Sequence, residues 1–165
     1  MLEFNTKDSI TVSIRPVKLE DAPTLQKNCL SADTLDMVEN VLKNDMEAMN
    51  KGDKVRLVAD LEGEVIGNLE LVFSHHPLEF HTSEIYTVVV DPRFQRKGIA
   101  TKLIETALKI ARERRQKIVK IGVEAKNVPA ERVYTKAGFK EYGRLEHGIV
   151  RNGVYDDIIL LKKDL

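Results

Sequence analysis

The sequence predicts a mixed α/β fold, and three observations support this prediction. Segments with apolar residues at every second position, or continuously apolar, alternate with segments that space apolar residues three and four apart. Two dipeptides, Glu62-Gly63 and Asn152-Gly153, each separate two strand-like segments and predict hairpins. A helical segment, Gly98–Arg115, joins two largely apolar strand-like segments and predicts a crossover connection between them.

The N-terminal half contains three predicted strands and two predicted helices. "ITVSIRP" alternates and stops at a proline, which is typical of a strand. Leu19, Ala22, Leu25 and Cys29 have helical spacing, and a second amphipathic segment follows Asp33, which we expect to be its N-cap. The predicted elements are a strand at Ile10–Pro16, helices over Lys18–Ser31 and Thr34–Asn50, and a hairpin of strands Lys54–Leu61 and Val65–Phe73.

The C-terminal half contains the crossover and a second hairpin. Pro129 suits the first turn of a short helix, and Gly138 suits the C′ position after it. The predicted elements are strand Glu84–Asp91, helix Gly98–Arg115, strand Lys117–Ala125, the short helix, and a hairpin within Tyr142–Lys163. The full order is β-α-α-β-β-β-α-β-α-β-β. No repeat or linker divides the chain, so we expect residues 1–165 to form a single domain.

Composition indicates a folded protein outside the membrane. Of 165 residues, 42% are hydrophobic and 32% are charged, which separates the chain from disordered sequences. No apolar run approaches the ~20 residues of a membrane helix, and the N-terminus lacks the features of a signal peptide. The single cysteine, Cys29, fits a reducing compartment, so we expect a cytoplasmic protein.

Charge is balanced overall but unevenly distributed. The formal net charge is zero, which argues against a general nucleic-acid binder. Residues Glu20–Asn50 contain seven acids and two bases, a net charge of −5, whereas Arg93–Lys120 contain ten bases and two acids, a net charge of +8. Two solvated helix faces would give the same pattern. The position of the basic segment around Gly98 favours an anion site.

The loop before the crossover helix matches neither of two familiar phosphate loops. It lacks the second glycine and the Lys-Ser/Thr pair of G-x-x-x-x-G-K-[ST], and it is not G-x-G-x-x-G. The first amides of a helix nevertheless attract anions. Gly98 and Ala100 are small enough to let a phosphate approach, Thr101 adds a hydroxyl, and Arg96 and Lys97 add charge. A glycine at a helix start without any ligand remains the alternative.

Two motifs carry a resemblance to a known family. The pattern Q-x-x-G-x-A, after an apolar strand that ends in "VDP", resembles motif A of the GNAT superfamily of N-acetyltransferases. "NVPAERVYTKAGF", Asn127–Phe139, resembles that family's N-x-x-A-x-x-x-Y-x-x-x-G-F segment. The resemblance covers about Ile10–Lys162. It implies a mixed, mostly antiparallel central sheet flanked by helices, acetyl-CoA as co-substrate and no metal.

The resemblance also implies a set of site residues. In the family, the strand before the loop splays from its neighbour, and its free backbone groups hold the pantetheine arm. The Val88 amide, or that of a neighbouring residue, is then the candidate oxyanion donor, Tyr134 the acid that protonates the leaving thiolate, and Glu84 the general base. The implied cofactor-binding residues are Val88, Val89, Val90, Gln95, Arg96, Lys97, Gly98, Ile99, Ala100, Thr101, Asn127 and Tyr134.

Each assignment has a plainer alternative. The valines can be ordinary core, Tyr134 a surface residue of an amphipathic helix, and Glu84 an exposed carboxylate at a strand end. His75, His76 or His81 could replace Glu84 as base. These histidines and Glu79 also suggest a metal, although their spacing matches no closed metal motif. Cys29 could be a nucleophile, but a lone cysteine on an apolar helix face is usually a packing residue.

The acceptor is predicted only as a class. We expect a primary amine: a small amine, an amino-acid-like molecule or a protein N-terminus. The resemblance places its entry between Leu30–Thr34 and the last hairpin, and the acidic balance of Glu20–Asn50 suits a cation. The ending "EHGIVRNGVYDDIILLKK" resembles bacterial and archaeal members that act on amino-acid-like substrates and protein N-termini.

Other classes and partners stay open at this point. A module that binds acyl-CoA and regulates a partner without turnover is the alternative function, and a dinucleotide-dependent oxidoreductase is a more distant one. We expect no nucleic-acid or membrane partner, and a homodimer remains open.

Overall fold

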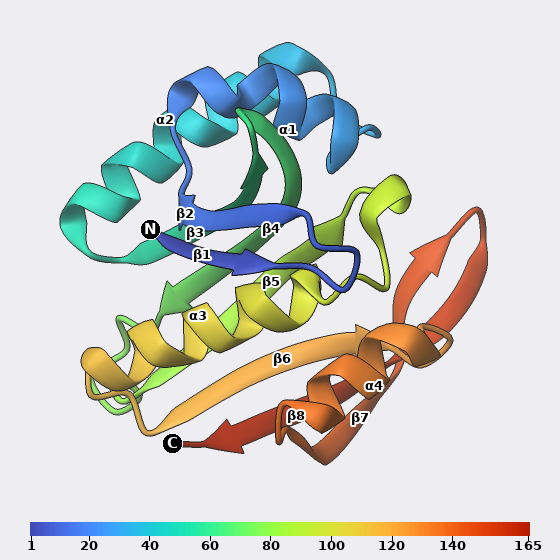
Figure 1. Cartoon of the computed structure of the whole chain (residues 1–165). Coiled ribbons are helices and arrows are strands. Elements are labelled where there is room, and N and C mark those ends of the chain that lie inside the picture. The colour runs from blue at the N-terminus through green and yellow to red at the C-terminus, as the bar shows by residue number, and fades with distance from the viewer.

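The computed structural model describes residues 1–165 as one eight-stranded sheet with helices on both faces (Figure 1). The strands lie side by side in the order β1-β2-β3-β4-β5-β6-β8-β7. Two 3₁₀ turns, η1 (Leu19–Asp21) and η2 (Pro92–Phe94), precede α1 and α3. The elements are β1 (Leu2–Asn5), β2 (Thr11–Pro16), α1 (Ala22–Asn28), α2 (Leu35–Lys51), β3 (Lys54–Leu61), β4 (Glu64–Phe73), β5 (Thr82–Val90), α3 (Ile99–Glu113), β6 (Ile118–Glu124), α4 (Val128–Lys136), β7 (Lys140–Arg151) and β8 (Val154–Asp164).

The sheet is mixed and mostly antiparallel, so the predicted fold class is confirmed. Six of the seven strand pairs are antiparallel, and only β5 and β6 run parallel, joined through α3. Both predicted hairpins form at the predicted dipeptides. Glu62 and Gly63 have φ of 51° and 89°, and Asn152 and Gly153 have φ of 50° and 77°. Positive φ at both central residues is the geometry that suits the right-handed twist of two flanking strands.

Two local predictions were wrong. No strand was predicted where β1 forms; this strand pairs with β2 at the edge of the sheet and is mostly exposed. The N-cap of α2 is Thr34 rather than Asp33: the Thr34 Oγ1 accepts a hydrogen bond from the Met37 amide at 3.3 Å. The Asp33 amide instead donates to the Leu30 carbonyl, at 3.0 Å, in the turn that connects α1 to α2.

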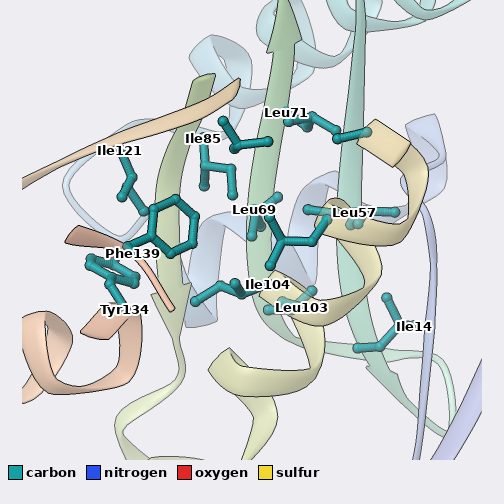
Figure 2. Close-up of a cluster of buried hydrophobic side chains, with 14 of the residues drawn as sticks. Ile14, Leu57, Leu69, Leu71, Ile85, Leu103, Ile104, Ile121, Tyr134 and Phe139 are labelled. Carbon is teal, nitrogen blue, oxygen red and sulfur yellow. The ribbon is translucent and has the colours of Figure 1, made fainter. Parts of the chain in front are cut away.

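The core lies in two layers, one on each face of the sheet. Neighbouring residues of β3 show the division, because Leu57 packs in the cluster around α3 while Val58 packs in the cluster around α1 and α2. Figure 2 shows the larger cluster, where Leu103 and Ile104 of α3 meet Ile85 and other strand side chains. This packing fixes α3 over the middle of the sheet, against β3, β4 and β5. None of the helices is both long and apolar enough to cross a membrane.

Candidate active site

The parallel strands β5 and β6 pair over only half of their length. Thr82–Ile85 pair in register with Ile118–Ile121. Beyond this point β5 continues to Val90 and β6 continues to Glu124, but the two strands no longer pair with each other. The crossover helix α3 starts just after the free end of β5. The sequence resemblance implied this separation, and the structure shows a sheet that is open in the middle.

A β-bulge shapes the free half of β5. The register between β4 and β5 shifts between Asn68 and Glu70, so two residues of β5, Thr87 and Val88, lie opposite one residue of β4. Thr87 has φ of 52°, an uncommon conformation for a β-branched residue. The Asn68 amide Nδ2 donates to the Thr87 carbonyl at 2.9 Å. Val88 has no strand partner in the register of either neighbour.

Two cavities meet at this opening. One has a volume of about 390 Å³ and the other about 380 Å³, and both are lined by Val88, Asn127 and Tyr134. The first cavity includes Glu84, Tyr86 and three aliphatic side chains of the C-terminal hairpin: Ile149, Ile158 and Leu160. The second runs beneath the start of α3, and its other lining residues are Val89, Val90, Phe94, Gln95, Arg96, Ile99, Ala100, Pro129, Ala130 and Val133.

Hydrogen bonds hold the loop before α3 in place at the end of β5. Arg93 donates to the buried Asp91 carboxylate through its amide and its guanidinium, at 2.7–3.2 Å, and this lowers the pKa of Asp91. The Gln95 side chain donates to the Val90 carbonyl at 3.1 Å. Arg96 and Gly98 both have positive φ, 60° and 90°, and Gly98 is the N-cap of α3. The unpaired amides at the start of this fifteen-residue helix therefore open beside the second cavity.

The structure brings most of the predicted cofactor-binding residues together, but not all. Val88, Val89, Val90, Gln95, Arg96, Ile99, Ala100, Asn127 and Tyr134 all line the second cavity. Lys97, Gly98 and Thr101 do not. Lys97 forms an ion pair with Asp8 in the turn between β1 and β2, and a Cβ added at Gly98 would meet no atom within 4 Å.

Tyr134 and Asn127 lie on the same side of α4, as their spacing predicted. Asn127 caps the helix, with its Oδ1 accepting from the Ala130 amide at 3.3 Å. The Tyr134 ring is 5% exposed and packs edge-on against Phe139, with ring centroids 6.4 Å apart (Figure 2). Burial raises the pKa of Tyr134 to about 12. The phenol therefore keeps its proton at neutral pH.

Glu84 faces the first cavity together with a residue that the sequence did not single out. Glu84 and Tyr86 both line this cavity and a smaller one of about 210 Å³ beside it. Lys120 of β6 lies 3.9 Å from the Glu84 carboxylate. Burial, and a hydrogen bond to Glu84, raise the pKa of Tyr86 to about 12. The i, i+2 spacing on a strand places Tyr86 on the face of Glu84, and this was the only signal that could have found it.

The alternative catalytic residues lie away from the cavities. His75, His76 and His81 line none of the three, and His75 instead lies 3.5 Å from Asp53. The structure contains no group of three or more His, Cys, Asp or Glu side chains arranged to hold a metal ion. Burial raises the pKa of the Cys29 thiol to about 12, so the thiolate form of a nucleophile is disfavoured.

Fewer acids of the segment Glu20–Asn50 are free to attract a cationic acceptor than the composition suggests. Asp21 is buried in an ion pair with Arg15 at 2.7 Å. Asp45 is buried between Arg56 and Lys54, at 2.5 and 2.6 Å. Two of the seven acids of Glu20–Asn50 are therefore neutralised inside the protein, and the Leu30–Thr34 connection does not line any of the three cavities.

Comparison with known proteins agrees with this geometry. The family model described as "Acetyltransferase (GNAT) family" matches residues 22–139. The L-amino acid N-acetyltransferase AaaT of Escherichia coli is 30% identical over 103 residues, which cover 62% of this chain and 63% of AaaT. The chain therefore spans less than two thirds of that relative's length.

Solved structures have the same fold. The ribosomal-protein-alanine N-acetyltransferase from Brucella melitensis superposes with a TM-score of 0.82 and 27% identity, over 93% of this chain and 99% of that one. The structure of yncA from Salmonella typhimurium was solved with its cofactor acetyl-CoA. It superposes with a TM-score of 0.80 and 20% identity, over 93% of this chain and 94% of yncA. With a family model that matches well over half of its length, the chain belongs to the acetyltransferase (GNAT) family.

Proposed function

We propose that residues 1–165 form a single N-acetyltransferase domain that moves an acetyl group from acetyl-CoA to a primary amine. The observation that carries the proposal is the opening between β5 and β6, where two cavities share Val88, Asn127 and Tyr134. One cavity lies beside the amides at the start of α3 and suits a pyrophosphate with its pantetheine arm. The other contains a carboxylate, Glu84, and suits an amine. The yncA structure with acetyl-CoA supports the choice of cofactor.

The proposed reaction is a direct attack. The amine gives up a proton to Glu84, directly or through water, and its nitrogen bonds to the thioester carbon. The carbonyl becomes a tetrahedral oxyanion that accepts a hydrogen bond from the Val88 amide. The carbon–sulfur bond then breaks, and Tyr134 gives its proton to the departing thiolate. The products are the acetylated amine and free CoA. Glu84 then releases the proton it took from the amine to solvent, and Tyr134 regains a proton from solvent.

We propose the acceptor only as a class: a molecule whose primary amine lies next to an aliphatic group. Ile149, Ile158 and Leu160 line the first cavity together with the polar side chains of Glu84 and Tyr86. An amino-acid-like molecule or a protein N-terminus combines these features. The two relatives support both, because AaaT is an L-amino acid N-acetyltransferase and the Brucella protein acts on ribosomal-protein alanine.

The test is thiol release from acetyl-CoA with a panel of acceptors. The panel contains free amino acids, their amides, spermidine and short peptides with a free α-amine. The proposal predicts release of CoA with at least one acceptor, and an acetylated product by mass spectrometry. An acyl-CoA-binding module without turnover would instead bind acetyl-CoA and release no thiol with any acceptor, and it would be unaffected by Tyr134→Phe.

A further inference from the structure

A buried polar network links α2 to the bulge of β5. Asp45 of α2 pairs with Arg56 and Lys54 of β3, and Arg56 and Lys54 both pair with Glu70 of β4. The distance from Arg56 to Glu70 is 2.7 Å. Arg56 is 2% exposed, Asp45 is 4% exposed, and the Glu70 side chain is 13% exposed. Burying four charges costs solvation free energy, and such networks are weak evidence for stability on their own.

The network ends on one residue, Thr87. Asn68 is fully buried, and its Oδ1 accepts from Arg56 at 3.0 Å, which turns its Nδ2 toward the Thr87 carbonyl at 2.9 Å. The Thr87 hydroxyl donates to Glu70 Oε1 at 2.9 Å. Both residues that flank the register shift on β4 therefore bond to the same residue of β5, one to its backbone and one to its side chain.

Thr87 needs such support because of its backbone. A residue with a branched Cβ at φ of 52° is strained, and strain of this kind persists only where the surroundings hold it. If the residue relaxed to negative φ, the bulge would disappear and the extra residue would shift the register of the following segment. Val88, which immediately follows and lines both cavities, would then change its orientation.

We propose that Asn68 and Glu70 are positioning residues, which hold Thr87 in its strained conformation so that the Val88 amide faces the thioester carbonyl. The inference rests on the proposed acetyl transfer, in which the Val88 amide is the oxyanion donor. Asp45, Arg56 and Lys54 line neither cavity. Their role in the reaction is therefore to support Asn68 and Glu70.

The decisive measurement compares two ligands. Acetonyl-CoA carries a ketone carbonyl one methylene away from the sulfur, so it cannot transfer an acetyl group, whereas CoA lacks the carbonyl. The pyrophosphate and pantetheine contacts are common to both ligands, so the ratio of their dissociation constants reports the contacts of the acetonyl group. A change in this ratio between wild type and variant reports the effect of the substitution on those contacts. The wild type is expected to prefer acetonyl-CoA. Asn68→Ala is expected to bring the ratio close to one, leave the CoA dissociation constant within about twofold, and lower kcat by about tenfold or more.

Two further variants separate positioning from packing. Glycine adopts positive φ without strain, so the double variant Asn68→Ala/Thr87→Gly is expected to regain most of the ligand preference that Asn68→Ala loses. Thr87 is exposed, so Thr87→Val is expected to fold, and it should reduce the preference while Thr87→Ser retains it. Asp21→Asn is the matched control, because it breaks a buried ion pair that does not reach β5. It should lower the melting temperature and leave the ratio unchanged.

The outcomes are distinct from those of the proposed function. A wild type that binds acetonyl-CoA and CoA equally, or folded Asn68→Ala and Thr87→Val variants that retain the preference, overturns the inference. A wild type that prefers acetonyl-CoA, with loss in Asn68→Ala and recovery in the glycine variant, supports it even if no acceptor is acetylated. Absence of turnover with every acceptor counts against the proposed function alone, because the ligand ratio needs no reaction.

Discussion

The ammonium of Lys120 lies 3.9 Å from the Glu84 carboxylate, on strands whose pairing ends one residue later. Glu84 and Lys120 are directly opposite in the parallel register of β5 and β6. The carboxylate that faces the first cavity is thus placed at the point where the sheet opens, and its partner is fixed by the same register. Glu84 is half-buried, so water or an amine is able to reach it.

Replacing Glu84 tests its role as base. Glu84→Gln keeps the shape of the side chain but removes the group that accepts a proton, so we expect a lower rate at neutral pH and a shift of the acid limb of the pH–rate profile. The measurement is kcat/KM against pH with the best acceptor of the panel. Glu141→Gln, an exposed change on β7, is the control. If the acid limb stays in place, the base lies elsewhere or the amine reacts already neutral.

Replacing Tyr134 tests the proton donor. Tyr134→Phe preserves the packing against Phe139 and removes only the hydroxyl. A positioned general acid contributes roughly 10²–10⁴ in rate, so we expect kcat to fall by about a hundredfold while the CoA dissociation constant changes by less than about threefold. Steady-state kinetics and isothermal titration separate the two effects. Tyr142→Phe, at an exposed position, should change neither. An unchanged kcat in Tyr134→Phe would remove the acid role.

Gly98 tests the anion site at the start of α3. Gly98→Asp introduces a carboxylate among the amides that would bind phosphate, and we expect CoA to bind at least about tenfold more weakly, or about 1.4 kcal/mol. Gly63→Asp is a matched control, because Gly63 has φ of 89° against 90° for Gly98, and neither added Cβ meets an atom within 4 Å. Both variants strain the backbone similarly. Equal CoA affinity in the two would mean that Gly98 acts only on folding.

The pH dependence of unfolding tests whether Arg93 anchors the loop before α3. Its guanidinium lowers the pKa of Asp91 below the ordinary value of 3.8, so this pair stabilises the fold above that pH, and its contribution is lost as the pH falls through the folded-state pKa. Arg93→Met should therefore destabilise the protein near neutral pH and move the midpoint of acid unfolding to higher pH. Circular dichroism against pH measures both.

The control for Arg93 is Lys109→Met, which breaks an exposed pair on α3 with a nitrogen–oxygen distance of 3.9 Å. Exposed pairs of this kind contribute little, so its acid midpoint should stay with the wild type. A midpoint for Arg93→Met that also stays with the wild type would show that the Asp91 pair does not hold the loop.

Local sequence signals predicted the parts of the fold that depend on local geometry. Glu62-Gly63 and Asn152-Gly153 formed hairpins because their residues tolerate the positive φ that a two-residue turn requires. Gly138, with φ of 91° after α4, follows the same logic. β1 was missed because four mostly exposed residues at a sheet edge show little periodicity. Asp33 was preferred to Thr34 as a cap because both residue types are suitable and only the backbone decides.

The candidate site was predictable only where a motif covers it. Tyr134, Asn127 and the segment around Gly98 came from patterns in consecutive residues. The bulge at Thr87 did not, because it depends on Asn68 and Glu70, which lie on another strand. Lys97 lies toward Asp8 for a similar reason: its partner belongs to a turn almost ninety positions earlier in the chain. Composition likewise did not show that Asp21 and Asp45 would be buried in ion pairs.

The partial pairing of β5 and β6 has a consequence for the behaviour of the unliganded protein. The separated halves leave two strand edges inside the sheet whose backbone groups have no strand partner. Unpaired edges of this kind promote association with other chains, and natural proteins usually cover them. A ligand that bonds along β5 would cover one edge and stabilise the folded state by mass action. The protein should therefore resist unfolding and association better with such a ligand bound than without it.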